Sequence, residues 1–337
     1  MTNLTWVVGS GGLLGSHVRR AVEDLAHVMP WSPSLAPFHW GDKATLETQL
    51  RAAVDAFLGS AVAGGHERWT VLWCAGSGVV GSSAADLAEE LRTWRQFLTW
   101  LSVGLSDTQI RSIPGQIFLA SSAGGVYGGS SERPLSEDSY CQPISEYGSV
   151  QLRKERLLDE WARGQPQIST LVARISNLYG PGQKMDKPQG LISQMSRCLI
   201  YRQAVHIYVP LDTIRDYLFV EDAARWIAGW TQWLAQEAAR TGEGRRELKI
   251  CASEEETTIA SLIGAFQRIA KRQLKVISGL HPVRSQQPAC LQFRSRVWPD
   301  EARPARTGLL VGMNRVYRHQ LALYQAGALP PTRPGLS

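Results

Sequence analysis

The first 26 residues consist of an apolar segment, a glycine-rich turn and a segment with helical periodicity. LTWVVGS at 4–10 predicts a buried strand, and GLLGSHVRRAVEDLA at 12–26 predicts an amphipathic helix. Neighbouring parallel strands need a long crossover connection, which is usually a helix. An opening strand that passes through glycines into a helix therefore favours a parallel sheet over any other architecture.

The glycines of this turn have the spacing GxxGxxG, formed by Gly9, Gly12 and Gly15. This spacing permits a tight turn, a close approach of the backbone to a pyrophosphate, and close packing of the helix on the strand. The N-terminus of a helix also presents N–H donors to an anion, here at Leu13 and Leu14. The turn therefore predicts a dinucleotide-binding site.

Apolar runs and helical patterns alternate through the first half of the chain. The runs with the length of strands lie at 27–31, 36–40, 70–76, 116–121 and 170–176. The helical patterns between them lie at 43–58, 84–102 and 147–162. This alternation predicts an α/β fold with a doubly wound parallel sheet, the Rossmann arrangement, covered by helices on both faces.

The regular alternation ends near residue 180, where PGQKMDKPQG is rich in proline and glycine. We expect residues 1–180 to form the dinucleotide-binding domain, and residues 181–337 to form mainly a smaller, partly interleaved substrate lobe. Within this second part, about 205–236 is predicted to return to the Rossmann core, because its end reads as a strand that enters a helix.

Composition narrows the class of partner. The net charge is +6, but lysine and arginine are spread along the chain without a dense basic run, which argues against nucleic acid. Arginine instead suits a phosphorylated small molecule. The five cysteines are scattered without metal-ligand spacing, so we expect free thiols and no metal. Without a basic leader or a membrane-spanning apolar stretch, the protein is expected to be cytoplasmic and not membrane-bound.

The end of the second predicted strand gives information on the cofactor. Proteins that prefer NAD commonly place an acid there to bind the ribose 2′-hydroxyl, whereas this chain has Ser32. A neutral residue tolerates a 2′-phosphate, which tilts the prediction toward NADP over NAD; alternatively, Ser32 only starts a turn before Pro33. Asp42, after the predicted strand at 36–40, is a candidate contact for the adenine side, or the N-cap of the next helix.

Four further motifs follow the glycine turn in order: SSAGGVYG at 121–128, YGSVQLRK at 147–154, RISNLYGPG at 174–182 and RDYLFVED at 215–222. Together with the turn, they resemble the extended short-chain dehydrogenase/reductase superfamily, of the nucleotide-sugar epimerase/dehydratase type. The resemblance covers roughly residues 4 to 225. It implies NAD or NADP as cofactor, a nucleotide-diphosphate sugar as substrate, and positions beside the cofactor for Ala75 and Ser121.

The resemblance also implies that Tyr147 is the acid/base residue, but one partner differs. A phenol has an unperturbed pKa near 10 and needs cationic neighbours to work near neutrality. The family's lysine position is occupied by Gln151, which can hydrogen-bond a ribose but carries no charge. Either Lys154 reaches back from nearly two turns away, or Tyr147 depends on the oxidised nicotinamide, or turnover is weak.

A second departure concerns the hydroxyl that polarises the substrate. The family's usual serine or threonine falls on Ala123, and Ser122 is the best replacement, although this serine could only terminate a strand. The same loop has Ala-Gly-Gly where dehydratases of the family carry an acidic pair. This difference argues against a dehydratase.

By the same resemblance, four residues are expected to bind the substrate. Asn177 would contact its diphosphate or sugar, Gln189 and Leu191 would line the nucleotide pocket, and Arg215 would clamp a phosphate. A surface ion pair of Arg215 with Asp216 is the alternative.

Two aromatic stripes have helical spacing. Trp226, Trp230 and Trp233 predict packing against the core. A second stripe is formed by Trp94, Phe97, Leu98 and Leu101. The family resembled often pairs this helix, and the one that carries Tyr147, across a two-fold axis. This predicts a homodimer, with a buried core in a monomer as the alternative.

The sequence therefore predicts an NAD(P)-dependent nucleotide-sugar epimerase that works through a transient keto-sugar. One alternative is an NADPH-dependent 4-ketoreductase, which would consume its nicotinamide stoichiometrically. The other is a dinucleotide-binding protein with weak or no turnover, prompted by Gln151 and Ala123.

Overall fold

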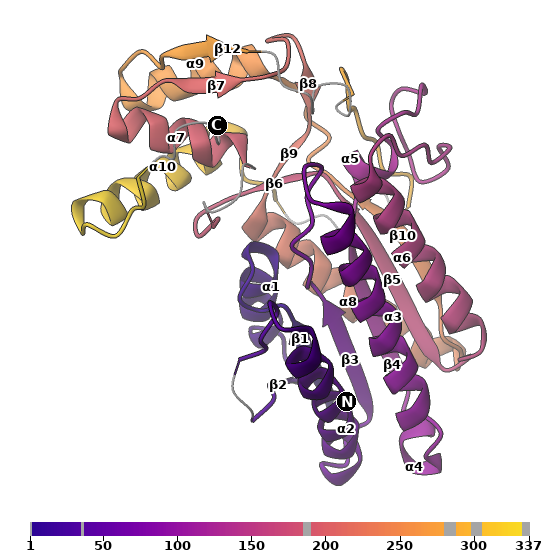
Figure 1. The fold of residues 1–337 in the computed structure, drawn as a ribbon. Helices are drawn as coiled ribbons and strands as arrows, with labels where there is room; N and C mark the ends of the chain where they lie inside the picture. Colours follow the sequence, from indigo (N-terminus) through magenta and orange to yellow (C-terminus); the bar gives the residue numbers. More distant parts are fainter. Residues whose placement is uncertain (1, 35–36, 185–189, 280–287, 298–304, 332–337) are drawn as a thin grey trace.

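A parallel six-stranded sheet forms the centre of the protein in the computed structural model (Figure 1), which describes residues 2–34, 37–184, 190–279, 288–297 and 305–331. The strand order is β10-β5-β4-β3-β1-β2, and every neighbouring pair is parallel. The strands are β1 (Asn3–Val8), β2 (Val28–Trp31), β3 (Arg68–Trp73), β4 (Gly115–Ser122), β5 (Ile168–Ile175) and β10 (Arg246–Cys251). The predicted doubly wound parallel sheet is confirmed.

Helices cover both faces of this sheet. Successive side chains of a strand point to opposite faces, so each strand contributes apolar side chains to two cores. Trp6 and Val8 of β1 pack with α2 (Lys43–Ala63) and α3 (Ala84–Gly104), and α6 (Glu146–Arg163) packs beside α3. Val7 packs on the other face, with α1 (Leu13–Glu23) and α8 (Val220–Thr241). The short helices are α4 (Thr108–Arg111) and α5 (Ala123–Val126).

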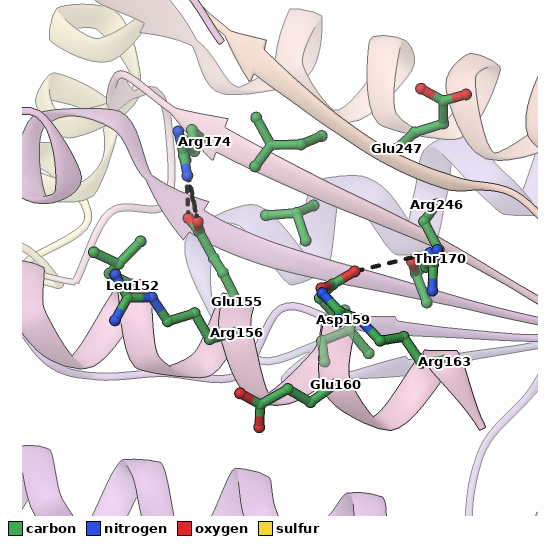
Figure 2. A pocket seen from close by; sticks show the side chains of 13 residues that line it. Leu152, Glu155, Arg156, Asp159, Glu160, Arg163, Thr170, Arg174, Arg246 and Glu247 are labelled. Carbon is green, nitrogen blue, oxygen red and sulfur yellow. Dashed lines mark hydrogen bonds and ion pairs between the residues drawn. The ribbon is translucent and has the colours of Figure 1, made fainter. Parts of the chain in front are cut away.

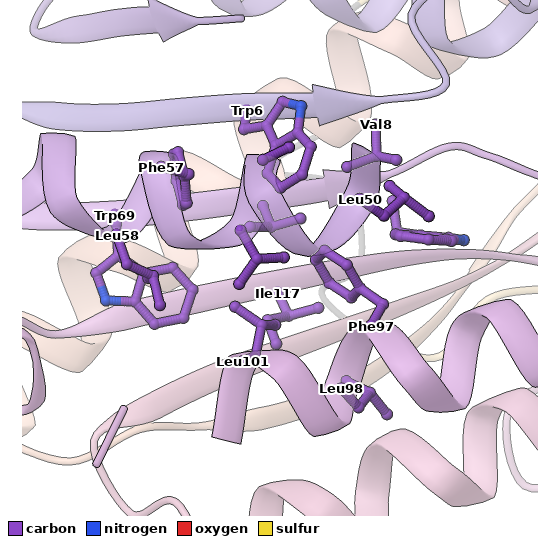
Figure 3. Close-up of a cluster of buried hydrophobic side chains, with 14 of the residues drawn as sticks. Trp6, Val8, Leu50, Phe57, Leu58, Trp69, Phe97, Leu98, Leu101 and Ile117 are labelled. Atoms are coloured by element: carbon purple, nitrogen blue, oxygen red, sulfur yellow. The ribbon is translucent and has the colours of Figure 1, made fainter. Parts of the chain in front are cut away.

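Aromatic rings fill the core under α2 and α3 (Figure 3). The ring centroids of Trp6 and Phe57 are 5.5 Å apart, and those of Trp73 and Phe97 are 4.6 Å apart. The stripe on α3 belongs to this core, since its four residues are at most 4% exposed: Trp94, Phe97, Leu98 and Leu101. Core packing within one chain thus accounts for this stripe, which lends no support to the predicted homodimer.

The second stripe packs as predicted. Trp226 and Trp230 are 2% and 1% exposed in the core beneath α8, and Trp233 packs against the same cluster.

A smaller lobe, which Figure 1 shows beyond β6 and β9, has a hydrophobic core of its own. Its helices are α7 (Leu191–Tyr201), α9 (Ile259–Ala270) and α10 (Leu309–Gln325). Its strand pairs are β7 (Val205–Ile207) with β12 (Val276–Ser278), and β8 (Ile214–Arg215) with β11 (Thr257–Thr258). The connection to the sheet domain is the pair β6 (Asn177–Tyr179) with β9 (Tyr217–Phe219).

Two strand assignments differ from the sequence prediction. Residues 37–40 of the predicted strand at 36–40 form none, because the backbone turns there: Trp40 N–H donates to the Phe38 carbonyl and Asp42 N–H to the His39 carbonyl. The sheet gains β10 instead, which was not predicted. The segment 205–236 divides, with β7 in the lobe and α8 on the sheet.

Across the described part of the chain, no helix has both the length and the apolar character that a membrane span requires. All five cysteines are free thiols, as expected.

Candidate active site

The glycine turn between β1 and α1 has the predicted geometry. Gly9 has φ +86°, and a Cβ on it would lie 2.7 Å from the Ala75 Cα. A Cβ on Gly15 would lie 2.2 Å from the Gly9 carbonyl oxygen, so the helix packs on the turn as only glycine allows. Ala75, two residues after β3, thus lies against the turn, and its place beside the cofactor stays a prediction.

The N-terminus of α1 differs from those of α3 and α6 and resembles that of α8. Ser83 and Ser145 cap α3 and α6 with side-chain oxygens, whereas α1 begins at Gly12 without a side-chain cap. The first N–H groups of α1, at Leu13 and Leu14, have no partner within the helix. Together with the helix dipole they form a favourable environment for a phosphate.

The two residues predicted for the ribose and adenine end lie beside β2 and α2. Ser32 is exposed directly after β2, at the position where proteins that prefer NAD commonly have an acid. Asp42 caps α2: its carboxylate accepts from the Thr45 N–H at 3.5 Å and the Thr45 hydroxyl at 2.5 Å, and these hydrogen bonds lower its pKa. The N-cap alternative is confirmed for Asp42, while a contact with adenine stays a prediction.

Tyr147 lies in the first turn of α6, with Ser122 next to it. Glycines let α5 and α6 approach: a Cβ on Gly148 would lie 2.1 Å from the Gly125 carbonyl oxygen. Burial raises the pKa of Tyr147 to about 12, a hydrogen bond with Ser122 opposes this rise, and the charge of Glu90 adds to it. The structure therefore brings Ser122 to the phenol, while Ala123 is fully buried.

Gln151 lies one turn further along α6. It is 5% exposed, and its Oε1 has no hydrogen-bond partner among the described residues. A buried acceptor without a protein partner is open to a donor from water or from a ligand. A ribose hydroxyl has the required chemistry.

Lys154 pairs with Glu90 on α3. Its Nζ lies 2.9 Å from Glu90 Oε1, with the lysine side chain only 1% exposed. The hypothesis that Lys154 supplies the missing cation directly to the phenol gains no support from the structure, because Glu90 holds the ammonium.

Ser121 is turned away from the cofactor side. Its hydroxyl donates to Glu155, which also accepts from the Arg174 guanidinium at 2.7 Å (Figure 2). Arg174 donates in addition to the Tyr127 hydroxyl. The donor of the Ser121 hydroxyl is thus taken by Glu155, and the cofactor contact of Ser121 stays a prediction.

A pocket of about 430 Å³ lies beyond this network, between α6, β5 and β10 (Figure 2). None of the predicted site residues lines it.

Arg215 is a buried cation at the end of β8. It is 8% exposed and donates to the Ile214 carbonyl at 2.9 Å, and within the described ranges no carboxylate lies within 4.0 Å of it. Burial lowers the pKa of Arg215, and an anion beside the guanidinium would oppose this effect by stabilising its charge. The surface ion pair with Asp216 is wrong, since Asp216 is 1% exposed and has other partners.

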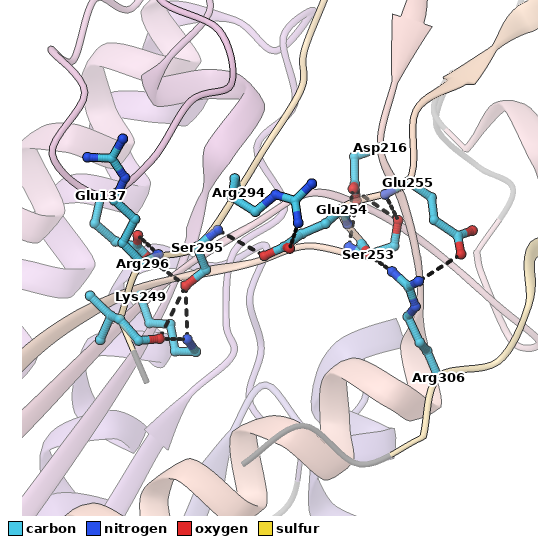
Figure 4. Close-up of polar contacts among 11 residues, drawn as sticks. Glu137, Asp216, Lys249, Ser253, Glu254, Glu255, Arg294, Ser295, Arg296 and Arg306 are labelled. Atoms are coloured by element: carbon cyan, nitrogen blue, oxygen red, sulfur yellow. Dashed lines mark hydrogen bonds and ion pairs between the residues drawn. The ribbon is translucent and has the colours of Figure 1, made fainter. Parts of the chain in front are cut away.

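Asp216 is a structural residue, for which the sequence analysis offered only the ion pair with Arg215. Its carboxylate accepts from the Ser176 hydroxyl at 2.5 Å. It also accepts from the Ser253 N–H and hydroxyl at 2.9 Å each, and from the Glu254 N–H at 2.6 Å (Figure 4). These contacts connect the end of β5 and the segment after β10 to the β8–β9 segment, and so fix the backbone that carries Arg215.

The remaining predicted substrate residues lie on the lobe side. Asn177 begins β6 and donates from Nδ2 to the Asp216 carbonyl at 2.9 Å. Leu191 opens α7. Gln189 lies outside the described residues.

The fold and the glycine turn define a dinucleotide-binding α/β protein of the Rossmann type. The model of the NAD dependent epimerase/dehydratase family matches residues 5–240, and the chain belongs to this family.

Curated relatives match shorter stretches. The dTDP-4-dehydro-6-deoxyglucose reductase of Escherichia coli is 30% identical over 158 residues, which are 45% of this chain and 45% of the reductase. The UDP-glucose 4-epimerase of Mycolicibacterium smegmatis is 30% identical over 102 residues, 30% of this chain and 32% of the epimerase. The chain therefore spans less than half of the length of these relatives.

Solved structures share the fold along the whole chain. The UDP-glucose-4-epimerase from Stenotrophomonas maltophila, with bound NAD and formylated UDP-arabinopyranose, has a TM-score of 0.75 at 17% identity and covers 97% of this chain and 100% of its own. RMD from Pseudomonas aeruginosa, complexed with NADPH, has a TM-score of 0.72 at 20% identity, with 96% and 99% covered.

Proposed function

We propose that the protein is an NAD(P)-dependent nucleotide-sugar epimerase that acts through a transient keto-sugar. The observation that carries this proposal is the arrangement of Tyr147 and Ser122 beside the segment that follows β3, whose Ala75 contacts the glycine turn. The names of the curated relatives support the substrate class, since they include epimerases and a reductase of nucleotide-linked sugars.

The residues of the site fit a nicotinamide dinucleotide. The turn at Gly9 and Gly15 has no room for a side chain, and the uncapped start of α1 faces the place of the pyrophosphate. The unpaired Oε1 of Gln151 suits a ribose hydroxyl. Exposed Ser32 favours NADP over NAD, because a neutral side chain does not repel a 2′-phosphate.

Each residue of the proposed site has its own role in the reaction. A bound nicotinamide supplies the hydride acceptor and donor. Tyr147 exchanges a proton with the sugar hydroxyl, and Ser122 orients that oxygen by a hydrogen bond. Asn177 and Leu191 line the substrate side, and Arg215 binds the diphosphate.

Arg215→Gln tests the phosphate contact. A hydrogen bond to a charged group contributes about 1.5–3 kcal/mol, so KM for the nucleotide sugar is expected to rise by about 10- to 150-fold. The matched control is Arg240→Gln on the surface of α8, where the side chain is 69% exposed and KM should not change. An unchanged KM in Arg215→Gln would remove this residue from the substrate site.

A 4-ketoreductase is the second candidate. The neutral residues Ser32 and Gln151 favour it, because a reductase uses NADPH and needs Tyr147 mainly as a proton donor. Native mass spectrometry of the purified protein identifies the bound nucleotide, and NMR of UDP- and dTDP-sugars follows the product. Interconversion of two epimers without net use of nucleotide supports the epimerase, and stoichiometric loss of NADPH supports the reductase.

A protein with weak or no turnover is the third candidate, and Gln151→Lys separates it from the enzymes. A large gain from near-zero activity would indicate a site limited by its missing cation. Robust turnover by the unchanged protein would exclude this candidate.

We also propose a homodimer that pairs the outer surfaces of α3 and α6. Val103 on α3 supports this, as an apolar side chain that is 65% exposed. Light scattering coupled to size-exclusion chromatography measures the molar mass, and a mass of one chain at micromolar concentration would contradict the dimer.

A further inference from the structure

A buried ion pair joins α3 to α6 beside the proposed active site. Lys154 Nζ lies 2.9 Å from Glu90 Oε1, and the two side chains are 1% and 14% exposed. The other carboxylate oxygen, Oε2, accepts from the N–H groups of Ser77 at 3.1 Å and Gly78 at 3.0 Å. The Lys154 carbonyl is held as well, since it accepts from the Trp94 indole at 3.1 Å. Both buried charges therefore have partners.

Glu90 binds the backbone of a segment, residues 75–78, that lies between the glycine turn and the Tyr147 ring. We call this segment the wall. A Cβ on Gly78 would lie 3.1 Å from Glu90 Oε2 and 3.5 Å from Tyr147 Cδ2. Three residues earlier in the same segment, Ala75 lies against Gly9. Glu90 is thus the side chain that ties this wall to α3.

The charges that face Tyr147 come from few places. Glu90 faces it from α3, with a negative charge that disfavours the phenolate. Ser122 at the end of β4 and Gln151 on α6 are neutral. Lys154, on the same helix, gives its charge to Glu90. Taken together, the described surroundings of the phenol hold one anion and no uncommitted cation.

We propose that Glu90 is a positioning residue for Tyr147, with Lys154 as its counter-ion: Glu90 fixes the backbone of Ser77 and Gly78 beside the ring, and its charge adds to the effect of burial in keeping the phenol protonated. The inference rests on the proposed function, because it assigns a task to the acid/base tyrosine. Lys154 is then still needed, but for Glu90 and not for the phenol.

The protonation state of Tyr147 affects the two directions of proton transfer differently. A protonated Tyr147 is ready to give its proton to a carbonyl oxygen that becomes a hydroxyl. The reverse step, removal of the proton of a sugar hydroxyl, needs the phenolate and is disfavoured near neutral pH. In this protein the reverse step should therefore gain more from a rise in pH than the forward step.

Titration of Tyr147 tests the proposal without nucleotide or sugar. Protein labelled with ¹³Cζ-tyrosine is titrated by NMR, and Tyr147→Phe assigns the signal. The unchanged protein should show no ionisation of Tyr147 up to about pH 11, since its pKa lies near 12. Glu90→Gln removes the anion and releases the Lys154 ammonium, and is expected to lower the midpoint by about one to three pH units.

Glu89→Gln is the matched control. Glu89 is the neighbouring residue on α3, but its carboxylate pairs with Arg92 and Lys43 at the surface. The Tyr147 midpoint should not move in this variant. A shift of equal size in both variants would indicate a general effect of charge, and would overturn the proposal.

The double variant Glu90→Gln/Lys154→Gln covers the case in which the single variant does not fold, because it keeps two amides that can hydrogen-bond across the pair. Its midpoint should also lie below that of the unchanged protein. A folded variant whose Tyr147 titrates as before would reduce the pair to a structural role and overturn the proposal. Absence of turnover with every nucleotide sugar, beside the expected shift, would instead count against the proposed function alone.

Discussion

Tyr147→Phe is expected to lower kcat for the nucleotide sugar by about 10²- to 10⁴-fold, the usual contribution of a positioned general acid/base. The substitution removes one hydroxyl from a ring that packs against Gly125, where a Cβ would lie 3.1 Å from Tyr147 Cε1. The ring and its packing remain, so the fold should be preserved. Calorimetric binding of NADP and NAD should change little, because the pyrophosphate contacts lie in the glycine turn.

Tyr140→Phe is the control for this experiment. Tyr140 is 75% exposed, in the loop between α5 and α6, and the loss of its hydroxyl should leave kcat unchanged. If Tyr147→Phe retains more than about a tenth of the activity, another group moves the proton, and the assignment of the site through Tyr147 fails.

Local patterns in the sequence predicted the sheet domain well. The glycine turn and the helices at 43–58, 84–102 and 147–162 depend on periodicity and on short motifs, which are visible in a single stretch of chain. The stripe of Trp226, Trp230 and Trp233 shows the same, since helical spacing alone places these residues on one buried face.

The errors arose where tertiary contacts decide the structure. The sequence of β10 is RELKIC, and its charged residues do not fit the pattern of a buried strand. Lys249 is nevertheless buried there, because it donates to the Ser295 hydroxyl at 2.9 Å. The Ser295 hydroxyl in turn donates to Glu137, which lies in a loop far away in the sequence (Figure 4). No local pattern predicts that such charges can be buried.

The candidate site was likewise predicted where short motifs carry it, and missed where tertiary contacts do. Tyr147 and Ser122 come from motifs, and the structure places them together. Glu90 was missed, because it stands among the charges of EELRTWR on α3 and is 64 residues from Lys154 in the sequence. Only the packing of α3 on α6 gives this carboxylate its place at the active site.

Arg174→Met is expected to lower the free energy of unfolding by about 3–5 kcal/mol, as is typical when one partner of a buried ion pair is removed. The side chains of Arg174 and Glu155 are each 6% exposed, and two guanidinium nitrogens of Arg174 donate to the carboxylate. Without Arg174, the Glu155 carboxylate keeps only the Ser121 hydroxyl from this network, and Tyr127 loses its partner. Urea unfolding followed by circular dichroism measures the change.

Arg163→Met, on the same helix as Glu155, separates burial from charge. Arg163 pairs with Asp159 at 2.7 Å but is 68% exposed, and exposed pairs of this kind contribute at most about 1 kcal/mol. A loss below about 1 kcal/mol in Arg174→Met would contradict the prediction. The double variant Arg174→Met/Glu155→Leu should recover much of the loss, because it leaves no uncompensated charge in the core. Since Ser121 directly precedes Ser122, the last residue of β4, a similar loss in the double variant would show that the network supports the active-site loop by its hydrogen bonds and not by its charge balance.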